Sequence, residues 1–236
     1  MKKSVTAAIL LVFYMSLCSV VCGQDPDKSA EADENSAGII SAINDKADSI
    51  NTFKANVITT VTKGAEKTVT EAKIIFEKPG RSNMQGSTSA FINGTLVRKD
   101  IEQAIISNGE ILWHYIPAMR MAAKVSLNAN GSPPIGNELA APFYGLDKNS
   151  LVFIGMDIAD DQVCYVIEGE RKDFVRPFKK MYFNVRTNLL CKQISRDIAS
   201  TNVEEITYKG VDINVPVSDE DFTFVVPAGV QVREAR

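Results

Sequence analysis

Few side chains in this chain have the types and spacing that catalysis or metal binding requires. His114 is the single histidine among 236 residues. No Cys-x-x-Cys pair occurs, so a metal site would have to be built from carboxylates. Asp157, Asp160 and Asp161 lie close together but lack the spacing of a calcium-binding loop. Neither a Gly-x-Ser-x-Gly elbow nor a phosphate-binding glycine loop is present. We therefore expect no enzyme, no metal and no cofactor.

A Ser-His-Asp triad is the catalytic alternative, and it would have to use His114. This histidine lies between Trp113 and Tyr115 in an apolar strand. In such a place a histidine is more often a packed side chain than a catalytic one. An enzyme that depends on His114 predicts a measurable loss of activity in His114→Ala.

The element that holds His114 is predicted to be a β-hairpin over Ile105–Pro117. Asn108-Gly109 separates two apolar runs, and this pair favours a type I′ turn with positive φ at both residues. The returning strand is apolar on both faces, with Ile111, Trp113 and Tyr115 on one and Leu112 and His114 on the other. Both faces should therefore be covered, as in a sheet that curves around something.

Residues 1–23 have the pattern of a cleaved export signal. Lys2 and Lys3 precede the apolar run Val5–Val21, which is short for a transmembrane helix, and small residues follow it. We place the cleavage after Gly23 and expect a periplasmic protein. Acylation of Cys22, which would anchor the protein to a membrane, is the alternative.

The charge and cysteine content narrow the possible partners and cross-links. With a net charge of −3 and no basic stripe, the chain is not expected to bind nucleic acid or anionic membranes through charge. Cys164 and Cys191 fall on predicted strands that a simple meander places two apart. At about 4.8 Å per strand this separation exceeds the reach of a disulfide, so we expect two buried thiols.

An acidic leader and a helix precede the strands. Gln24–Ala37 lacks large apolar residues and is predicted to be a disordered leader. The domain proper is expected over residues 38–236. Its first element is an amphipathic helix that Ser36 can cap. Its apolar stripe comprises Ile39, Ile40, Ile43, Ala47 and Ile50.

From Thr52 onward the apolar period changes to two, which predicts an antiparallel meander of short strands. Strands are expected at 52–61, 68–77, 81–87, 91–107, 111–125, 151–156, 162–170, 179–185, 189–198, 203–213 and 222–226. Asn128–Asn149 breaks this pattern, being too proline-rich for a central strand and too apolar for a plain loop. A short helix near Gly136–Ala141 is predicted there, either as a lid over a curved sheet or as an ordinary core-covering helix.

Three motifs in order resemble the periplasmic outer-membrane lipoprotein carrier family, the LolA-like proteins. They are Ile74–Arg81, Ile105–Pro117 and the Phe-x-Phe-x-x-Pro-x-Gly-Val-x-Val ending at Phe222–Val232. The resemblance implies a mainly β fold with α: a strongly curved antiparallel sheet, or incomplete β-barrel, covered by the N-terminal helix and a short helical lid.

The resemblance also implies a function without catalysis. Proteins of this family bind the acyl chains of lipoproteins in an apolar cavity and ferry them from an inner-membrane release complex to an outer-membrane acceptor. Each buried CH₂ group is worth about 0.8 kcal/mol, so such chains need shielding from water. A monomer with lipidated proteins as partners is the expectation for this chain.

Eight residues are expected to line the cavity under this resemblance. They are Ile74, Phe76, Lys78, Met84, Ile105, Leu112, Phe143 and Tyr144. Lys78 stands where the family has an arginine that holds the lid closed, and a lysine lacks the forked geometry of a guanidinium. Ser82 and Met84 stand where the family has aromatic residues, which makes this wall smaller and more adaptable.

Other functions use the same fold and remain open from the sequence. One is a regulatory binding module that senses envelope lipids or stress through a protein partner. Another is a membrane-anchored lipoprotein acceptor. The identity of the cargo, the lipidation of Cys22 and the lid role of Lys78 are likewise open.

Overall fold

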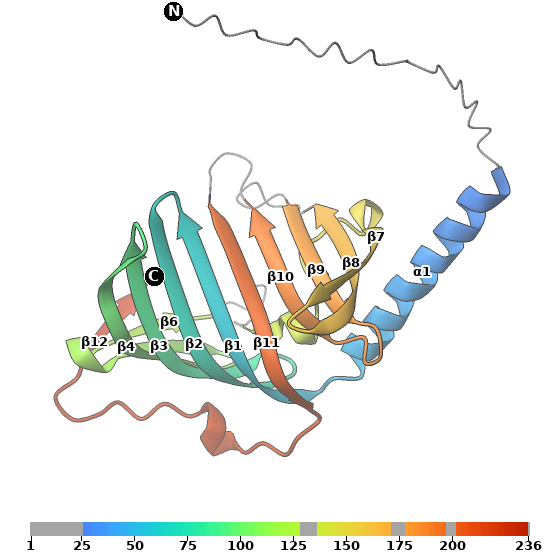
Figure 1. Ribbon diagram of the computed structural model, residues 1–236. Coiled ribbons are helices and arrows are strands. Elements are labelled where there is room, and N and C mark those ends of the chain that lie inside the picture. Colours follow the sequence, from blue (N-terminus) through green and yellow to red (C-terminus); the bar gives the residue numbers. More distant parts are fainter. Residues whose placement is uncertain (1–25, 128–135, 171–177, 197–201, 236) are drawn as a thin grey trace, which may run out of the picture.

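The computed structural model describes residues 26–127, 136–170, 178–196 and 202–235, which form one long helix and a twelve-stranded curved sheet (Figure 1). The helix is α1 (Pro26–Asp48). The strands are β1 (Thr52–Lys63), β2 (Glu66–Glu77), β3 (Arg81–Ile92), β4 (Thr95–Asn108), β5 (Ile111–Ile116), β6 (Met121–Ser126), β7 (Val152–Ala159), β8 (Gln162–Glu170), β9 (Phe178–Asn184), β10 (Leu190–Arg196), β11 (Val203–Ile213) and β12 (Gln231–Ala235). Short 3-10 turns are η1 (Pro117–Met119), η2 (Asn137–Leu139), η3 (Lys148–Ser150) and η4 (Asp219–Phe222).

The strand order is β12-β6-β5-β4-β3-β2-β1-β11-β10-β9-β8-β7. Sheet neighbours are also consecutive in the sequence except at β1–β11 and β6–β12, and β6 and β7 do not pair. The predicted antiparallel meander is therefore confirmed within β1–β6 and within β7–β11, which join through the antiparallel pair β1–β11, whereas β12 pairs with β6 in parallel and makes the sheet mixed. Because β12 and β7 are the two ends of this order, the sheet is open and curved instead of being a closed barrel.

The register assigns side chains to two faces of the sheet. Residues that pair across strands point to the same face, and alternate residues of a strand point to opposite faces. Ile74 pairs with Met84, Met84 with Ile105, and Ile105 with His114. We call their side the helix-side face, because α1 and residues 136–151 pack on it. The opposite side is bordered by the chain between β11 and β12, the tail, and we call it the tail-side face.

The hydrophobic core lies on the helix-side face. Ile43 and Ile50, from and just after α1, are fully buried against the sheet. The rings of Phe53 and Phe76 stack beneath them with centroids 5.0 Å apart. The other buried members of this core are Ala55, Val57, Ile74, Leu139, Ala140, Phe143, Leu146, Ile167, Met181, Phe183, Leu190 and Tyr208. The predicted apolar stripe of the helix is thus confirmed.

The start of the helix differs from the prediction. α1 begins at Pro26, so most of the predicted disordered leader 24–37 is helical. Proline suits the first helical position, where its missing N–H has no intrahelical partner. Ala30, Glu31 and Ala32 are then good helix formers, and their propensity outweighs the lack of large apolar residues on which the prediction was based.

The hairpin around His114 is present as β4 and β5, but its turn is not of type I′. Gly109 has a φ of +95°, whereas Asn108 is not among the residues with positive φ. Instead, the Asn108 Oδ1 atom accepts hydrogen bonds from the backbone N–H groups of Glu110 (3.0 Å) and Ile111 (2.8 Å). The asparagine side chain therefore shapes this turn in place of its backbone.

Candidate functional site

Three of the eight predicted cavity residues lie together in the core. Ile74 and Phe76 are each 2% exposed, and Phe143, from the segment after β6, packs into the same cluster. The Phe143 ring lies 5.6 Å from the ring of Phe183 on β9. In this structure these side chains fill the space between the sheet and the segments that pack on it, α1 and residues 136–151, which we call the cover. We call the layer of sheet side chains beneath the cover the wall, and here it is closed.

Three further predicted residues extend this wall across the sheet. Met84, Ile105 and Leu112 lie on the helix-side face and are half-buried. His114 lies in the same row, where its Nε2 atom is 3.1 Å from the Gln103 side-chain oxygen. The large apolar side chains of the helix-side face are therefore fully buried at β2 and half-buried at β3, β4 and β5.

A polar atom is enclosed within this wall. Ser82 pairs with Phe76 and is 1% exposed, yet its hydroxyl has no hydrogen-bond partner among the described residues. A buried hydroxyl left unpaired costs about 1–3 kcal/mol. The Ser82 hydroxyl is therefore a buried polar group that the described residues leave unpaired.

Lys78 holds the covering helix. Its Nζ donates hydrogen bonds to the backbone carbonyl oxygens of Ala47 (3.1 Å) and Asp48 (3.2 Å), in the last turn of α1. The Ala47 carbonyl also accepts a hydrogen bond of 3.2 Å from the Ile50 backbone N–H, and both carbonyls lie at the negative end of the helix dipole. A flexible ammonium can serve both of them, so Lys78 ties α1 to the end of β2.

Replacement of Lys78 by methionine should loosen this attachment. We expect faster hydrogen exchange in the last turn of α1 and a loss of about 1 kcal/mol of stability, because one cationic cap is removed while the aliphatic stem is kept. Lys78→Arg is the matched control and should retain most of the protection. Equal exchange rates in Lys78→Met and the wild type would contradict this role.

The predicted helical lid is wrong in its structure. Residues near Gly136–Ala141 form only the 3-10 turn η2, and residues 128–135 lie outside the described part. Gly136 has a φ of +89°, and a Cβ atom there would lie 1.8 Å from the Ile74 Cδ1 atom. The segment therefore crosses β2 so closely that any added Cβ atom would force the end of the Ile74 side chain to move. Tyr144, the last predicted cavity residue, is 56% exposed and lies outside the wall.

Polar contacts also hold this segment to the sheet. The Tyr208 hydroxyl on β11 donates a hydrogen bond of 3.0 Å to a carboxylate oxygen of Glu138. Burial, and then the negative charge of Glu138, raise the pKa of Tyr208 well above its ordinary value. The phenol therefore stays protonated and keeps donating. Lys179 Nζ lies 3.5 Å from the carbonyl oxygen of Pro142.

The tail-side face carries a groove that sequence reasoning missed. It has a volume of about 880 Å³, within the range of small-molecule sites. Its lining residues are Asn56, Val57, Ile58, Glu71, Ala72, Lys73, Gln85, Gly86, Ser87, Glu102, Gln103, Ala104, Ile106, Tyr115, Pro117 and Phe224. Its polar residues on alternate strand positions looked like an ordinary solvated face, and only the curvature of the sheet brings five strands into one groove.

The tail (Asn214–Val230) borders this groove. Phe224 packs on Trp113 and Tyr115, with ring centroids 5.2 and 5.4 Å apart. These two aromatic residues belong to the hairpin face opposite His114. The tail is thus the cover that the second apolar face of this hairpin was expected to have.

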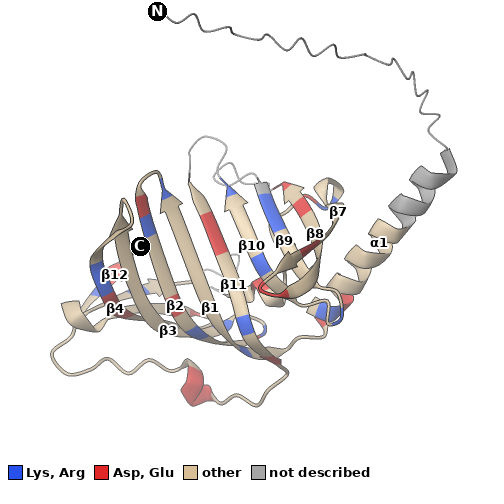
Figure 2. Cartoon of the chain, viewed as in Figure 1, with Lys and Arg blue, Asp and Glu red and all other residues tan. Residues whose placement is uncertain are grey.

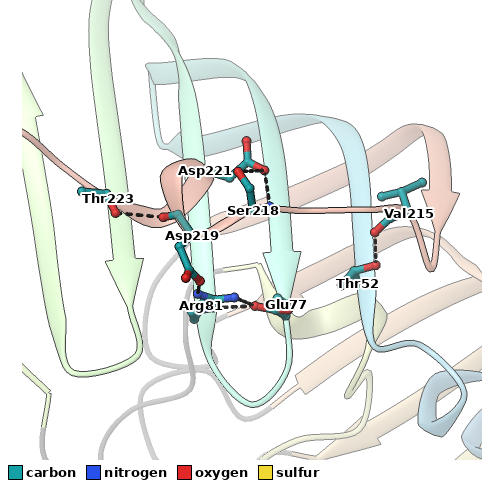
Figure 3. A network of polar contacts seen from close by, with 8 residues as sticks. All are labelled: Thr52, Glu77, Arg81, Val215, Ser218, Asp219, Asp221 and Thr223. Atoms are coloured by element: carbon teal, nitrogen blue, oxygen red, sulfur yellow. Dashed lines mark hydrogen bonds and ion pairs between the residues drawn. The ribbon is translucent and has the colours of Figure 1, made fainter.

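A polar network anchors the tail to the β2–β3 hairpin (Figure 3). Arg81 forms ion pairs with Glu77 and with Asp219, and its guanidinium lies 4.6 Å from the centre of the Phe222 ring. The Thr52 hydroxyl donates a bond of 2.6 Å to the Val215 carbonyl. The hydrogen bonds to Asp219 and Glu77 raise the pKa of Arg81, which therefore stays charged.

Both cysteines of the described chain are buried free thiols, as predicted. They lie on β8 and β10, with β9 between them. Both belong to one small buried cluster with Ala159, Val166 and Tyr182, and no disulfide joins them, as predicted. Burial raises the pKa of both thiols, and that of Cys191 to about 12.

This shift predicts alkaline destabilisation. The folded state keeps the Cys191 thiol protonated up to about pH 12, whereas the thiol of the unfolded chain ionises near its ordinary value of 9.0. Its contribution to stability is therefore complete below pH 9 and is lost as the pH rises towards 12. Urea unfolding at pH 8, 10 and 11 should show a steeper decline for the wild type than for Cys191→Ala. Identical declines would rule out this contribution.

Within the described ranges, no group of three or more His, Cys, Asp or Glu side chains is arranged to hold a metal ion. No helix among the same residues is both long and apolar enough to cross a membrane.

Comparison of the sequence with known proteins finds a distant relative. No protein-family model matches the chain. An uncharacterised protein of Methanocaldococcus jannaschii is 23% identical over 204 residues, which are 84% of this chain and 53% of that protein. The chain thus spans about half the length of the curated relative it matches.

Solved structures show the fold more directly. An uncharacterised conserved protein of Thermus thermophilus aligns with a TM-score of 0.52 at 9% identity. LprF of Mycobacterium bovis aligns with a TM-score of 0.50 at 10% identity, and each alignment covers 84% of this chain and 98% of the other. A LolA superfamily protein of Nitrosomonas europaea aligns more loosely, with a TM-score of 0.39 at 14% identity over 78% of this chain and 97% of its own. At the level of the fold, the chain is similar to the Thermus thermophilus protein and to LprF.

Proposed function

We propose that this protein is a periplasmic carrier that binds the acyl chains of lipoproteins on the helix-side face and ferries them toward the outer membrane. The observation that carries the proposal is the wall formed by Ile74, Met84 and Ile105, which is fully buried under the protein's own chain at Ile74 and half-buried at Met84 and Ile105. Acyl chains that slide under this cover would exchange water for apolar contacts, worth about 0.8 kcal/mol per CH₂ group.

The attachment of the cover suits reversible opening. Lys78 holds the end of α1 through two backbone carbonyls, and Tyr208 holds the segment after β6 through Glu138. Hydrogen bonds of this kind each contribute only about 1–3 kcal/mol net. The unpaired Ser82 hydroxyl supplies a donor for an ester carbonyl of the lipid. None of these roles needs a catalytic group, so the proposal describes a non-enzymatic carrier.

Uptake of a fluorescent diacylated lipopeptide by delipidated mature protein tests the proposal. Ile105→Glu places a charge on the helix-side wall and should weaken uptake at least tenfold, because an ionised carboxylate resists transfer into an apolar site. Gln85→Glu is the matched control: it adds the same charge on the tail-side face of β3 and should leave uptake unchanged. The proposal would be contradicted if the wild type took up no lipopeptide and mass spectrometry found no lipidated protein after native purification.

The tail-side groove favours a second candidate, a lipid-sensing regulatory module of the same fold. A sensor needs a binding surface apart from the lipid wall, and the 880 Å³ groove beneath Phe224 is such a surface. In that case Gln85→Glu, and not Ile105→Glu, would abolish capture of a membrane-anchored regulator. An intact mass of the mature protein from its native host separates both candidates from an acceptor acylated on Cys22.

A further inference from the structure

One end of the sheet carries an unusual pair of hairpin turns. The β1–β2 turn and the β3–β4 turn lie at the same rim, because each strand reverses the direction of the one before (Figure 1). The backbone N–H of Asn93 donates a 3.0 Å hydrogen bond to the carbonyl oxygen of Ala65, which joins the two turns. We call residues 63–67 and 91–100 together the double tip.

The double tip is apolar and exposed at its end. Ile92, Leu96 and Val97 are 44%, 45% and 55% exposed. Ile92 pairs with Thr95 and Leu96 with Phe91, so Ile92 and Leu96 point to opposite faces of the hairpin, and Val97 lies at the bulge that follows. A hairpin that lies along a protein surface needs apolar side chains on one face only. Apolar residues on both faces instead suit a tip that is immersed on all sides in an apolar medium.

Basic residues flank this apolar end in the sequence. Lys63 and Lys67 lie on the β1–β2 side, and Arg98 and Lys99 follow Val97 on β4. Figure 2 shows basic segments of the ribbon, in blue, close to the β1–β2 turn. All four are exposed. The acids of the double tip are Glu66 and Asp100, so it has a net positive charge on a chain whose net charge is −3. The nearest ion pair, between Lys99 and Asp100, is 3.8 Å long and exposed on both sides, so it neutralises little.

We propose that the double tip docks the protein on the surface of a bilayer containing anionic phospholipids, with Ile92, Leu96 and Val97 inserted among the headgroups and the four cations on the lipid phosphates. Interfacial binding grows with the apolar area buried and with electrostatic attraction to anionic lipids. Each cation near such a surface is worth about fivefold in affinity. Because the whole chain has a negative net charge, this local excess of positive charge is not apparent from the composition. Docking goes beyond the proposed function, since it needs no acyl chain in the wall.

Flotation with vesicles tests the docking directly. Mature protein is mixed with vesicles of phosphatidylcholine alone or with 30% phosphatidylglycerol, at low and high salt. Wild-type protein should float with the anionic vesicles, and less so at high salt. Arg98→Gln with Lys99→Gln should weaken binding about twentyfold. Leu96→Ser with Val97→Ser should also release the protein, even at low salt.

Matched controls keep the test specific. Arg186→Gln with Arg233→Gln removes two exposed cations elsewhere, and Val225→Ser replaces a 78% exposed apolar residue of the tail. Both should float as the wild type does. Unchanged urea midpoints exclude misfolding of the variants. Failure of the wild type to float, equal binding to neutral vesicles, or equal losses in the controls would overturn the proposal. Lipopeptide uptake in vesicle-free solution should be normal in the tip variants, so the docking and the carrier function succeed or fail separately.

Discussion

Phe76→Ala is expected to lower the free energy of unfolding by about 3–5 kcal/mol. Phe76 is 2% exposed and stacks on Phe53 beneath α1. The substitution removes a full ring and leaves a cavity, because the backbone pairing of β2 with β1 and β3 holds these strands in place. A loss of this size is a large share of the 5–15 kcal/mol that stabilises a typical domain.

Urea denaturation followed by circular dichroism measures this loss. Tyr144→Ala is the matched control, since it also removes an aromatic ring that was predicted to line the cavity, but from a residue that is 56% exposed. It should change stability by no more than about 0.5 kcal/mol. A loss below about 1 kcal/mol in Phe76→Ala would show that the wall does not pack as described.

Gly136→Ala should destabilise the protein by about 2–5 kcal/mol. About 1–2 kcal/mol comes from the positive φ, which an L side chain tolerates poorly, and about 1–3 kcal/mol from crowding against Ile74. The added methyl group would lie 1.8 Å from the Ile74 Cδ1 atom, so either that side chain or the segment after β6 must move. The same shift should speed the uptake of lipopeptide by loosening the cover.

Two further variants separate strain from crowding. Gly145 has a φ of +73° and open space around it, so Gly145→Ala should cost only the backbone strain. Ile74→Val removes the atom that clashes, at a cost of about 0.5–1.5 kcal/mol on its own. Combined with Gly136→Ala it should be less harmful than the sum of the two single changes. Simple additivity in this double-mutant cycle would contradict the close approach.

Much of the wall could be predicted because strand geometry is local. Side chains alternate between faces with a period of two, so the parity of Ile74, Phe76 and Met84 settled which of them share a face once their strands were found. The apolar stripe of α1 follows from its own period in the same way.

Predictions failed where a turn or a contact overrode the local pattern. Residues 111–125 were expected to form one strand, but η1 breaks them into β5 and β6 at Pro117, with Arg120 at a φ of +47°. Residues 222–226 were expected to form a strand, yet Phe222 ends the turn η4 and packs under Arg81. The break at η1 is local, at Pro117 and Arg120, whereas at η4 the contact with Arg81, which is distant in the sequence, accompanies the turn.

The sequence by itself determined the class of fold, the face that each strand residue occupies, the amphipathic helix and the buried state of both thiols. Each of these depends on periodicity or composition within a short stretch of chain. Only the tertiary structure decided that Lys78 holds the helix end, that the tail covers Trp113, and that a groove and a basic, apolar double tip exist. These features arise where segments far apart in the chain meet, and no local period encodes which segments will do so.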